Sequence, residues 1–119
     1  MRTFVSHIKQ VGGLKILFNE NFEKRFDSKI EINVYRIIIE LLNNSIKYAN
    51  ATTVDIDLIL DDDKLILNYH DDGVGFDLEK VEKGLGHVNI VNRSQSLNGD
   101  YEYFSEINKG MTFKLTIKV

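Results

Sequence analysis

The stretch "VYRIIIELLNNSIKYANATTVDIDLIL", residues 34–60, changes its hydrophobic period once, and that change predicts a helix followed by a strand. Up to Ala49, apolar residues recur at spacings of three and four, which places them on one face of a helix. We expect this helix from Ile30 to about Ala49, with Asn50 as its end. From residue 52 to residue 60 apolar and polar residues alternate, as they do in a half-buried strand.

The segments on either side of this stretch predict a mixed sheet. Further strands are expected at 14–22, 65–71, 101–107 and 111–119, and a second amphipathic helix at 85–97. Polar turns at 61–64 and around 108–110 make two hairpins, so the sheet cannot be purely parallel. We therefore expect an α+β fold, a two-layer α/β sandwich with a mixed sheet of about five strands and helices packed on one face.

Length and composition are those of one ordinary domain. The chain has 119 residues, of which 43% are hydrophobic and 28% charged, and this length can bury a sizeable core. We interpret residues 1–13 as a leader or the remnant of an upstream linker, and 14–119 as a single domain. No apolar stretch is long enough to span a bilayer and no signal peptide is visible, so a cytoplasmic location without direct membrane contact is expected.

The charge and the cysteine count exclude several classes of protein. A net charge of −3 gives no electrostatic case for binding nucleic acid or an anionic membrane. The absence of cysteine excludes disulfides, thiolate catalysis and cysteine-ligated zinc. The three histidines are not at metal-ligand spacing, so a histidine-rich metal site is not expected either.

A second stripe runs along the first predicted helix, away from its apolar face. Arg36, Glu40, Asn44 and Lys47 follow one another at spacings of four, four and three, and Asn43 lies at the edge of the stripe. Such stripes are usually only a solvated face. However, asparagine is a poor helix former, and an acid, an amide oxygen and an ammonium within a few turns would suit a metal–phosphate group.

Two glycine-containing segments remain to be explained. The segment "DDGVGF", residues 71–76, leaves a predicted strand, and alone it would be an ordinary turn. The segment "GLGHVN", residues 84–89, opens a helix, where unpaired backbone N–H groups favour anions. It lacks the third glycine of a dinucleotide fingerprint, and the chain has no Walker loop. A calcium loop is excluded because the ligand spacing is wrong.

Taken together, three motifs resemble those of a known family. The segments "ELLNNSIKY" (40–48), "DDGVGF" (71–76) and "GLGHVNIVNR" (84–93) are similar to the N, G1 and G2 boxes of the ATP-binding domain of two-component sensor histidine kinases. This is the GHKL or HATPase_c superfamily, with the Bergerat fold, shared with gyrase, a heat-shock chaperone class and mismatch-repair proteins. The resemblance covers roughly 15–119, and it is greatest to the nitrate-sensor and lipid-fluidity-sensor branch.

At the phosphate end, the resemblance implies Mg-ATP as the ligand. Asn44 matches the magnesium-binding residue, and Mg²⁺ commonly shares phosphates with one protein oxygen. Glu40 matches the catalytic acid, which could act as a general base. Lys47 would meet a phosphate as a point charge. The nucleotide-binding positions carried over from the boxes also include Asn43, Tyr48, Gly84, Leu85 and Gly86.

At the other end, the resemblance implies that Asp71 accepts a hydrogen bond from the adenine amino group. Gly73 and Gly75 would let the chain turn beneath the base without a Cβ clash, and Phe76 completes the box. Asp72 points away from Asp71 if both lie in a strand, so no base contact is expected from it. The sequence departs from the family where Tyr48 replaces a usual histidine and Met111 a usual serine or threonine.

The implied enzyme is a protein-histidine kinase whose phosphoacceptor lies elsewhere. His7 has too few residues around it for the family's helical hairpin, and His70 reads as a strand residue. The implied partners are therefore ATP, the phosphoacceptor dimerisation domain of a parent kinase that could be membrane-anchored, and a response regulator. Two alternatives stay open: an anti-sigma-factor type serine kinase of the same superfamily, and a degenerate module that binds no nucleotide.

Overall fold

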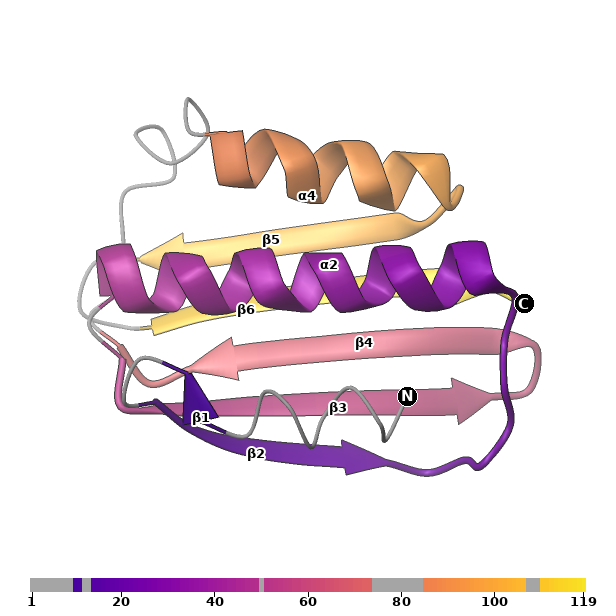
Figure 1. Cartoon of the computed structure of the whole chain (residues 1–119), viewed down its shortest axis with the longest axis horizontal. Coiled ribbons are helices and arrows are strands. Elements are labelled where there is room, and N and C mark those ends of the chain that lie inside the picture. The colour runs from indigo at the N-terminus through magenta and orange to yellow at the C-terminus, as the bar shows by residue number, and fades with distance from the viewer. Residues whose placement is uncertain (1–9, 12–13, 50, 74–84, 107–109) are drawn as a thin grey trace.

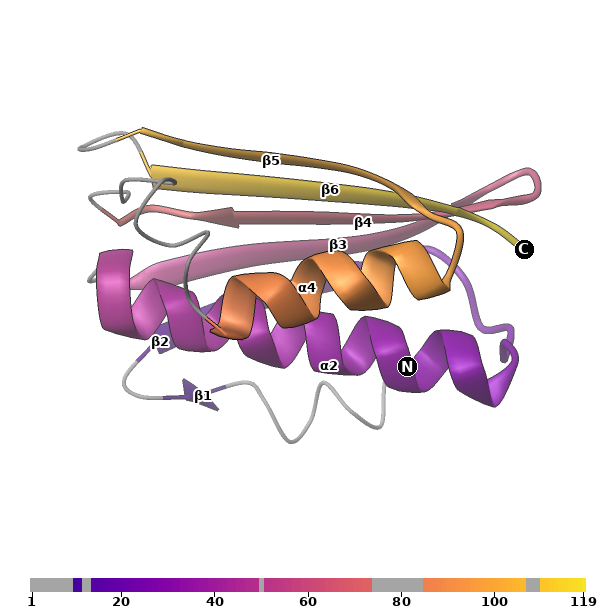
Figure 2. The same ribbon diagram turned by 90° about the horizontal axis from the view of Figure 1, so that it is seen from above.

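The computed structural model of the chain describes residues 10–11, 14–49, 51–73, 85–106 and 110–119. Both helices, α2 and α4, lie on the same face of one mixed sheet, so the expected two-layer sandwich is confirmed (Figure 1, Figure 2). The helical elements are α2 (Ser28–Asn44), η1 (Ser45–Ala49) and α4 (Leu85–Ser96). The strands are β1 (Gln10–Val11), β2 (Leu14–Glu20), β3 (Thr53–Asp61), β4 (Lys64–Asp71), β5 (Asp100–Glu106) and β6 (Gly110–Lys118).

The strand order in the sheet is β1-β2-β3-β4-β6-β5, five full strands plus the two-residue β1. Among the described strands only β2 and β3 pair in parallel, and α2 provides the crossover that a parallel pair requires. The other pairs are antiparallel. Gln10 and Val11, which belong to the segment interpreted as a leader, pair with Lys15 and Leu14 of β2.

Helix α2 begins two residues earlier than expected, because Asp27 caps it. The Asp27 side chain accepts a hydrogen bond from the Lys29 backbone N–H at 3.0 Å, as N-cap residues do. The helix also does not continue as an α-helix to residue 49. From Ser45 onward it widens into a single π-helical stretch, a feature that is frequent at functional sites.

The core forms between the sheet and the two helices. The alternation in β3, β4 and β6 puts one apolar set on the face beneath the helices and the polar set on the other face. The largest fully buried side chains of the core are Tyr69, Phe113, Leu14, Ile37, Ile38, Leu41, Leu42, Ile56, Leu58, Leu65, Leu67 and Ile90. Along the part of the chain that the structure describes, no helix is long and apolar enough to cross a bilayer.

Gly110 brings the start of β6 against the end of β4. Its φ is +81°, a left-handed conformation that favours glycine. A Cβ atom at this position would lie 2.5 Å from the Asp71 backbone oxygen. The close approach of β6 to β4 at Asp71 therefore requires this glycine.

Candidate functional site

The predicted motifs converge on one end of the sandwich. Figure 1 shows the last turns of α2 with η1, the end of β4 and the first turn of α4 gathered at the same edge. The start of β6 lies there too, because Asp71 pairs with Met111. Four chain segments that are distant in the sequence thus meet in one region.

Asp71 is a fully buried carboxylate at the centre of this region, with an exposed fraction of 0%. Its Oδ1 accepts hydrogen bonds from the backbone N–H groups of Gly73 and Met111, each at 3.1 Å. Its Oδ2 accepts one from the Ser45 hydroxyl at 2.7 Å. Burial of an ionised group is costly unless it is hydrogen-bonded, so these three donors stabilise the carboxylate in place.

Tyr69 extends the same network into the core. Its hydroxyl lies 2.6 Å from the Ser45 Oγ, and both residues are fully buried. Burial raises the pKa of Tyr69 well above its usual range, and the Asp71 charge acts in the same direction, although the Ser45 hydrogen bond opposes them. The Tyr69 hydroxyl therefore stays neutral and remains a hydrogen-bond donor.

Asn44 is buried at the same end, not solvated as the stripe pattern alone would suggest. Its exposed fraction is 5%, and its Nδ2 has no hydrogen-bond partner among the residues that the structure describes. Burial raises the pKa of Tyr103 to about 12, an effect that the adjoining Asn44 side chain opposes and the Asp71 charge reinforces. The Tyr103 side chain therefore lies near both Asn44 and Asp71.

The donor set fits the metal that the resemblance implies. In the described ranges no group of three or more histidine, cysteine, aspartate or glutamate residues could hold a metal by itself. Mg²⁺ bound through phosphates needs only one or two protein oxygens and keeps several waters. Asn44 offers one such oxygen, on a buried amide whose Nδ2 has no hydrogen-bond partner within geometric limits among the described residues.

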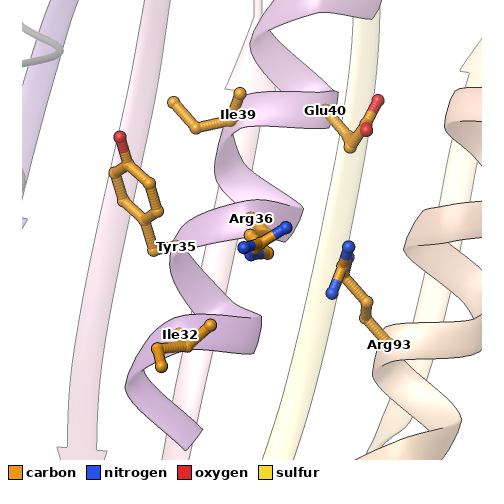
Figure 3. A pocket seen from close by; sticks show the side chains of 6 residues that line it. All are labelled: Ile32, Tyr35, Arg36, Ile39, Glu40 and Arg93. Atoms are coloured by element: carbon orange, nitrogen blue, oxygen red, sulfur yellow. The ribbon is translucent and has the colours of Figure 1, made fainter. Parts of the chain in front are cut away.

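Glu40 lies one turn before Asn44 and faces α4. Its Oε1 accepts a 3.4 Å hydrogen bond from Asn89 Nδ2 of α4. It also lines an open pocket of about 430 Å³, in which Figure 3 shows Arg93 reaching from α4 toward α2. The other lining residues are Ile32, Tyr35, Arg36 and Ile39. Arg36 and Glu40 of the predicted stripe therefore do lie together.

The remaining predicted site residues are divided between described and undescribed positions. Asn43 and Lys47 are exposed near the end of the helix, and Gly73 donates its N–H to Asp71. The backbones of Tyr48, Leu85 and Gly86 lie in η1 and in the first turn of α4. Gly75, Phe76 and Gly84 lie outside the described residues, so their predicted roles stay predictions.

Asp72 has a structural partner set of its own, as expected for a side chain that points away from Asp71. It accepts hydrogen bonds from the backbone N–H groups of Thr52 and Thr53 and from the Thr52 hydroxyl, at 2.7–2.9 Å. The hydrogen bond from the Thr53 N–H is the main cause that lowers the pKa of Asp72. Burial acts against it, and the Thr52 hydrogen bonds add to the lowering. Asp72 thus ties the end of β4 to the start of β3.

Ser45 and Tyr69 were missed by the sequence reasoning, although each had a usable signal. Tyr69 precedes Asp71 by two residues in a strand, so the two side chains share a face. Ser45 follows Asn44 directly within the first motif. The π-helical widening at Ser45 had no comparable signal in the sequence.

Comparison with known proteins places the chain among ATPases. Residues 29–119 match the family model described as histidine kinase-, DNA gyrase B-, and HSP90-like ATPase. The oxygen sensor histidine kinase NreB of Staphylococcus carnosus is 32% identical over 99% of this chain. The sensor histidine kinase ComP of Bacillus subtilis is 39% identical over 82% of it. The matched regions are 35% of NreB and 13% of ComP.

Solved structures agree with the fold. The histidine kinase domain of the blue-light activated histidine kinase from Erythrobacter litoralis EL346 has a TM-score of 0.74 at 17% identity, over 98% of this chain and 56% of that one. The Acinetobacter baumannii histidine kinase AdeS has a TM-score of 0.66 at 19% identity, over 98% and 58%. At these identities the likeness shows the arrangement of helices and strands.

Proposed function

Since the chain belongs to the family of histidine kinase-, DNA gyrase B-, and HSP90-like ATPases, we propose that it is the Mg-ATP-binding catalytic domain of a sensor histidine kinase. The relatives NreB and ComP, both sensor histidine kinases by name, support the kinase class within this broader family. The chain spans about a third of NreB and about an eighth of ComP. The activity of the whole protein is therefore part of the proposal.

The observation that carries the proposal is the joint burial of Asp71 and Asn44 at one end of the sandwich. Ser45 follows Asn44 in the chain and donates to Asp71, so the two predicted ligand groups belong to one connected region. Asp71 would accept a hydrogen bond from the adenine amino group. Asn44 would face the phosphates at the other end of the same nucleotide.

The residues present would divide the chemistry of phosphoryl transfer as follows. Asn44 would hold Mg²⁺, which supplies charge neutralisation at the phosphates when it is bound. Lys47 would add a positive charge beside them. Positioning and electrostatic stabilisation carry most of the catalysis in such reactions, so these contacts matter more than any covalent step on this domain.

The acceptor would be a histidine on the phosphoacceptor dimerisation domain of the parent kinase. Its imidazole nitrogen attacks the γ-phosphorus, the bond from that phosphorus to the β–γ bridging oxygen breaks, and ADP leaves. Glu40, held at 3.4 Å from Asn89, would accept the imidazole proton or polarise the attacking nitrogen. The phosphoryl group would then pass to an aspartate of a response regulator.

Titration calorimetry of the 119-residue chain with ATP, in magnesium and in EDTA, tests this proposal. We expect wild type to bind ATP more tightly with magnesium, and Asn44→Ala to lose that difference because it removes the oxygen ligand. Asn68→Ala is the matched control, since Asn68 is a half-buried β4 residue whose side chain alternates away from those of Leu67 and Tyr69.

Two results would contradict the proposal in different ways. No heat with wild type at millimolar ATP would favour a module that binds no nucleotide. An unchanged magnesium effect in Asn44→Ala would remove Asn44 from the metal site while leaving ATP binding intact. Phosphotransfer to a histidine-containing partner domain, and not to a serine, would separate the kinase class from its serine-specific relatives.

A further inference from the structure

The direction of the hydrogen bonds between Tyr69, Ser45 and Asp71 is fixed by chemistry. An ionised carboxylate can only accept, so the 2.7 Å contact to Asp71 Oδ2 uses the Ser45 hydroxyl proton. The Ser45 oxygen must then accept at its 2.6 Å contact with Tyr69, which donates its own proton. The result is a one-way chain from Tyr69 through Ser45 to Asp71, entirely within the core.

Counting acceptor positions shows what this chain leaves open. Two carboxylate oxygens offer about four lone-pair positions. Oδ1 uses two of them for the N–H groups of Gly73 and Met111. Oδ2 uses one for Ser45. The described residues therefore leave one acceptor position on Oδ2, in an orientation that the three existing bonds determine.

We propose that Ser45 and Tyr69 are positioning residues that aim this last acceptor position of Asp71 at the amino group of the purine, and so set the preference for a 6-amino over a 6-oxo base. This inference rests on the proposed function, because it needs Asp71 to face a nucleotide. Neither Ser45 nor Tyr69 is proposed to contact the base. They act only through the orientation of the Asp71 carboxylate.

The selectivity follows from which groups meet at Oδ2. A 6-amino purine brings an N–H donor to the open position, and a hydrogen bond to a charged acceptor is stronger than a neutral one. A 6-oxo purine brings an oxygen, so two acceptors face each other and both lose their hydration. A carboxylate held on three sides cannot turn away from this clash. One that has lost the Ser45 bond can turn, and the penalty on the 6-oxo base then falls.

Binding of ATP and of inosine triphosphate, which differ at the 6-position, tests the proposal by calorimetry on the 119-residue chain. We expect wild type to prefer ATP, and Ser45→Ala to reduce the ratio of the two affinities roughly tenfold. Tyr69→Phe should reduce the ratio by a smaller factor, because Ser45 still reaches Asp71 but loses the donor that fixes its direction.

Ser94→Ala provides a matched control. Ser94 is equally buried, but its hydroxyl donates to the Ile90 backbone oxygen within α4 at 2.8 Å. Ser94→Ala should therefore lower the melting temperature without changing the ratio of ATP to inosine triphosphate affinity. A merely structural role for Ser45 would give the same pattern as Ser94.

The outcomes separate this inference from the proposed function. If wild type prefers ATP and Ser45→Ala keeps that preference, the positioning role is wrong while the ATP site stands. If wild type binds both nucleotides equally, the role of Asp71 is wrong and the positioning role is wrong with it. If wild type binds neither nucleotide, the proposed function itself is wrong. Should Ser45→Ala fail to fold, the ratio measured for Tyr69→Phe decides, since that variant removes only one oxygen.

Discussion

The two ends of α2 each bury one carboxyl group, and the way each is held differs. At the start of the helix Glu31 is 4% exposed, and at the other end Asp71 of β4 is 0% exposed. Glu31 takes its partners, Arg25 and the Phe26 N–H, from within six residues of its own chain segment. Asp71 takes Ser45 from 26 residues away and the Met111 N–H from 40 residues away.

This difference is the one we expect between a structural carboxylate, Glu31, and a carboxylate with the binding role proposed for Asp71. The hydrogen bonds of Glu31 join it to the segment just before α2. Its role is therefore confined to the start of that helix. The bonds of Asp71 come from three separate chain segments, and the described residues leave one acceptor position open on Oδ2. A buried carboxylate that draws its donors from distant segments and keeps one acceptor position open among the described residues is what the proposed adenine contact requires.

The largest expected effect on ATP affinity comes from removing the charge of Asp71, near the C-terminal end of α2. Asp71→Asn should weaken ATP binding by about 1.5–3 kcal/mol, roughly tenfold to more than a hundredfold, because a hydrogen bond to a charged acceptor is lost. Calorimetry with Mg-ATP measures the affinity. Circular dichroism of the same samples shows whether the fold is kept.

Asp72→Asn is the neighbouring control for this prediction. Asp72 is exposed and bonded only to Thr52 and Thr53 among the described residues, so the same substitution there should affect stability and leave ATP affinity near wild type. If Asp71→Asn binds ATP as tightly as wild type, Asp71 has no binding role that distinguishes it from Glu31 at the other end of α2.

The sequence alone predicted the main helices and strands, and it predicted that the motifs meet near the end of α2. It predicted local details of the fold less well. The spacing in residues 34–60 was enough for the helix and for β3, since both periods are strong and long. The resemblance identified Asp71 and Asn44 as partners in one site, and the structure brings both to the same end of the sandwich. The five main strands and the shared helix face were confirmed, whereas the binding roles of Asp71 and Asn44 stay predictions.

What the sequence could not predict depends on contacts between distant segments. The burial of Asn44 within a charged stripe follows from packing at the end of the sheet near Tyr103. The last turn is π-helical from Ser45 onward, and no residue propensity predicts this. Aspartate is a preferred N-cap residue, so the cap at Asp27 could have been predicted from the sequence.

A smaller effect is expected from Glu31 at the start of α2, and it should change stability alone. Glu31→Gln should lower the free energy of unfolding at pH 7 by about 1–2 kcal/mol, because the Phe26 N–H loses a charged acceptor in a partly buried place. Burial would raise the pKa of Glu31, but the Phe26 and Arg25 hydrogen bonds outweigh it and the pKa is lowered. Urea unfolding of the variant and wild type measures the difference.

The same lowered pKa gives this effect a pH dependence. A carboxyl group whose pKa falls on folding stabilises the fold fully above its ordinary value of 4.5, and this contribution is lost as the pH falls through the lower folded value. The gap between wild type and Glu31→Gln should therefore be full at pH 7 and shrink below about pH 4.5. A gap that grows in acid would contradict this account, and ATP affinity at pH 7 should not change.

The smallest effect is expected from Arg25, and it decides what holds Glu31. The guanidinium makes two bonds to the Glu31 carboxylate, at 3.1 and 3.2 Å, but the Arg25 side chain is 81% exposed. Exposed ion pairs contribute about 0.2–1 kcal/mol and are screened by salt. Arg25→Ala should thus cost less than Glu31→Gln in urea unfolding, and the cost should fall further in high salt. Arg25→Lys keeps the charge but loses the paired N–H groups, so it should lie between Arg25→Ala and wild type. If Arg25→Ala instead costs as much as Glu31→Gln, the ion pair and not the Phe26 backbone bond fixes the start of α2.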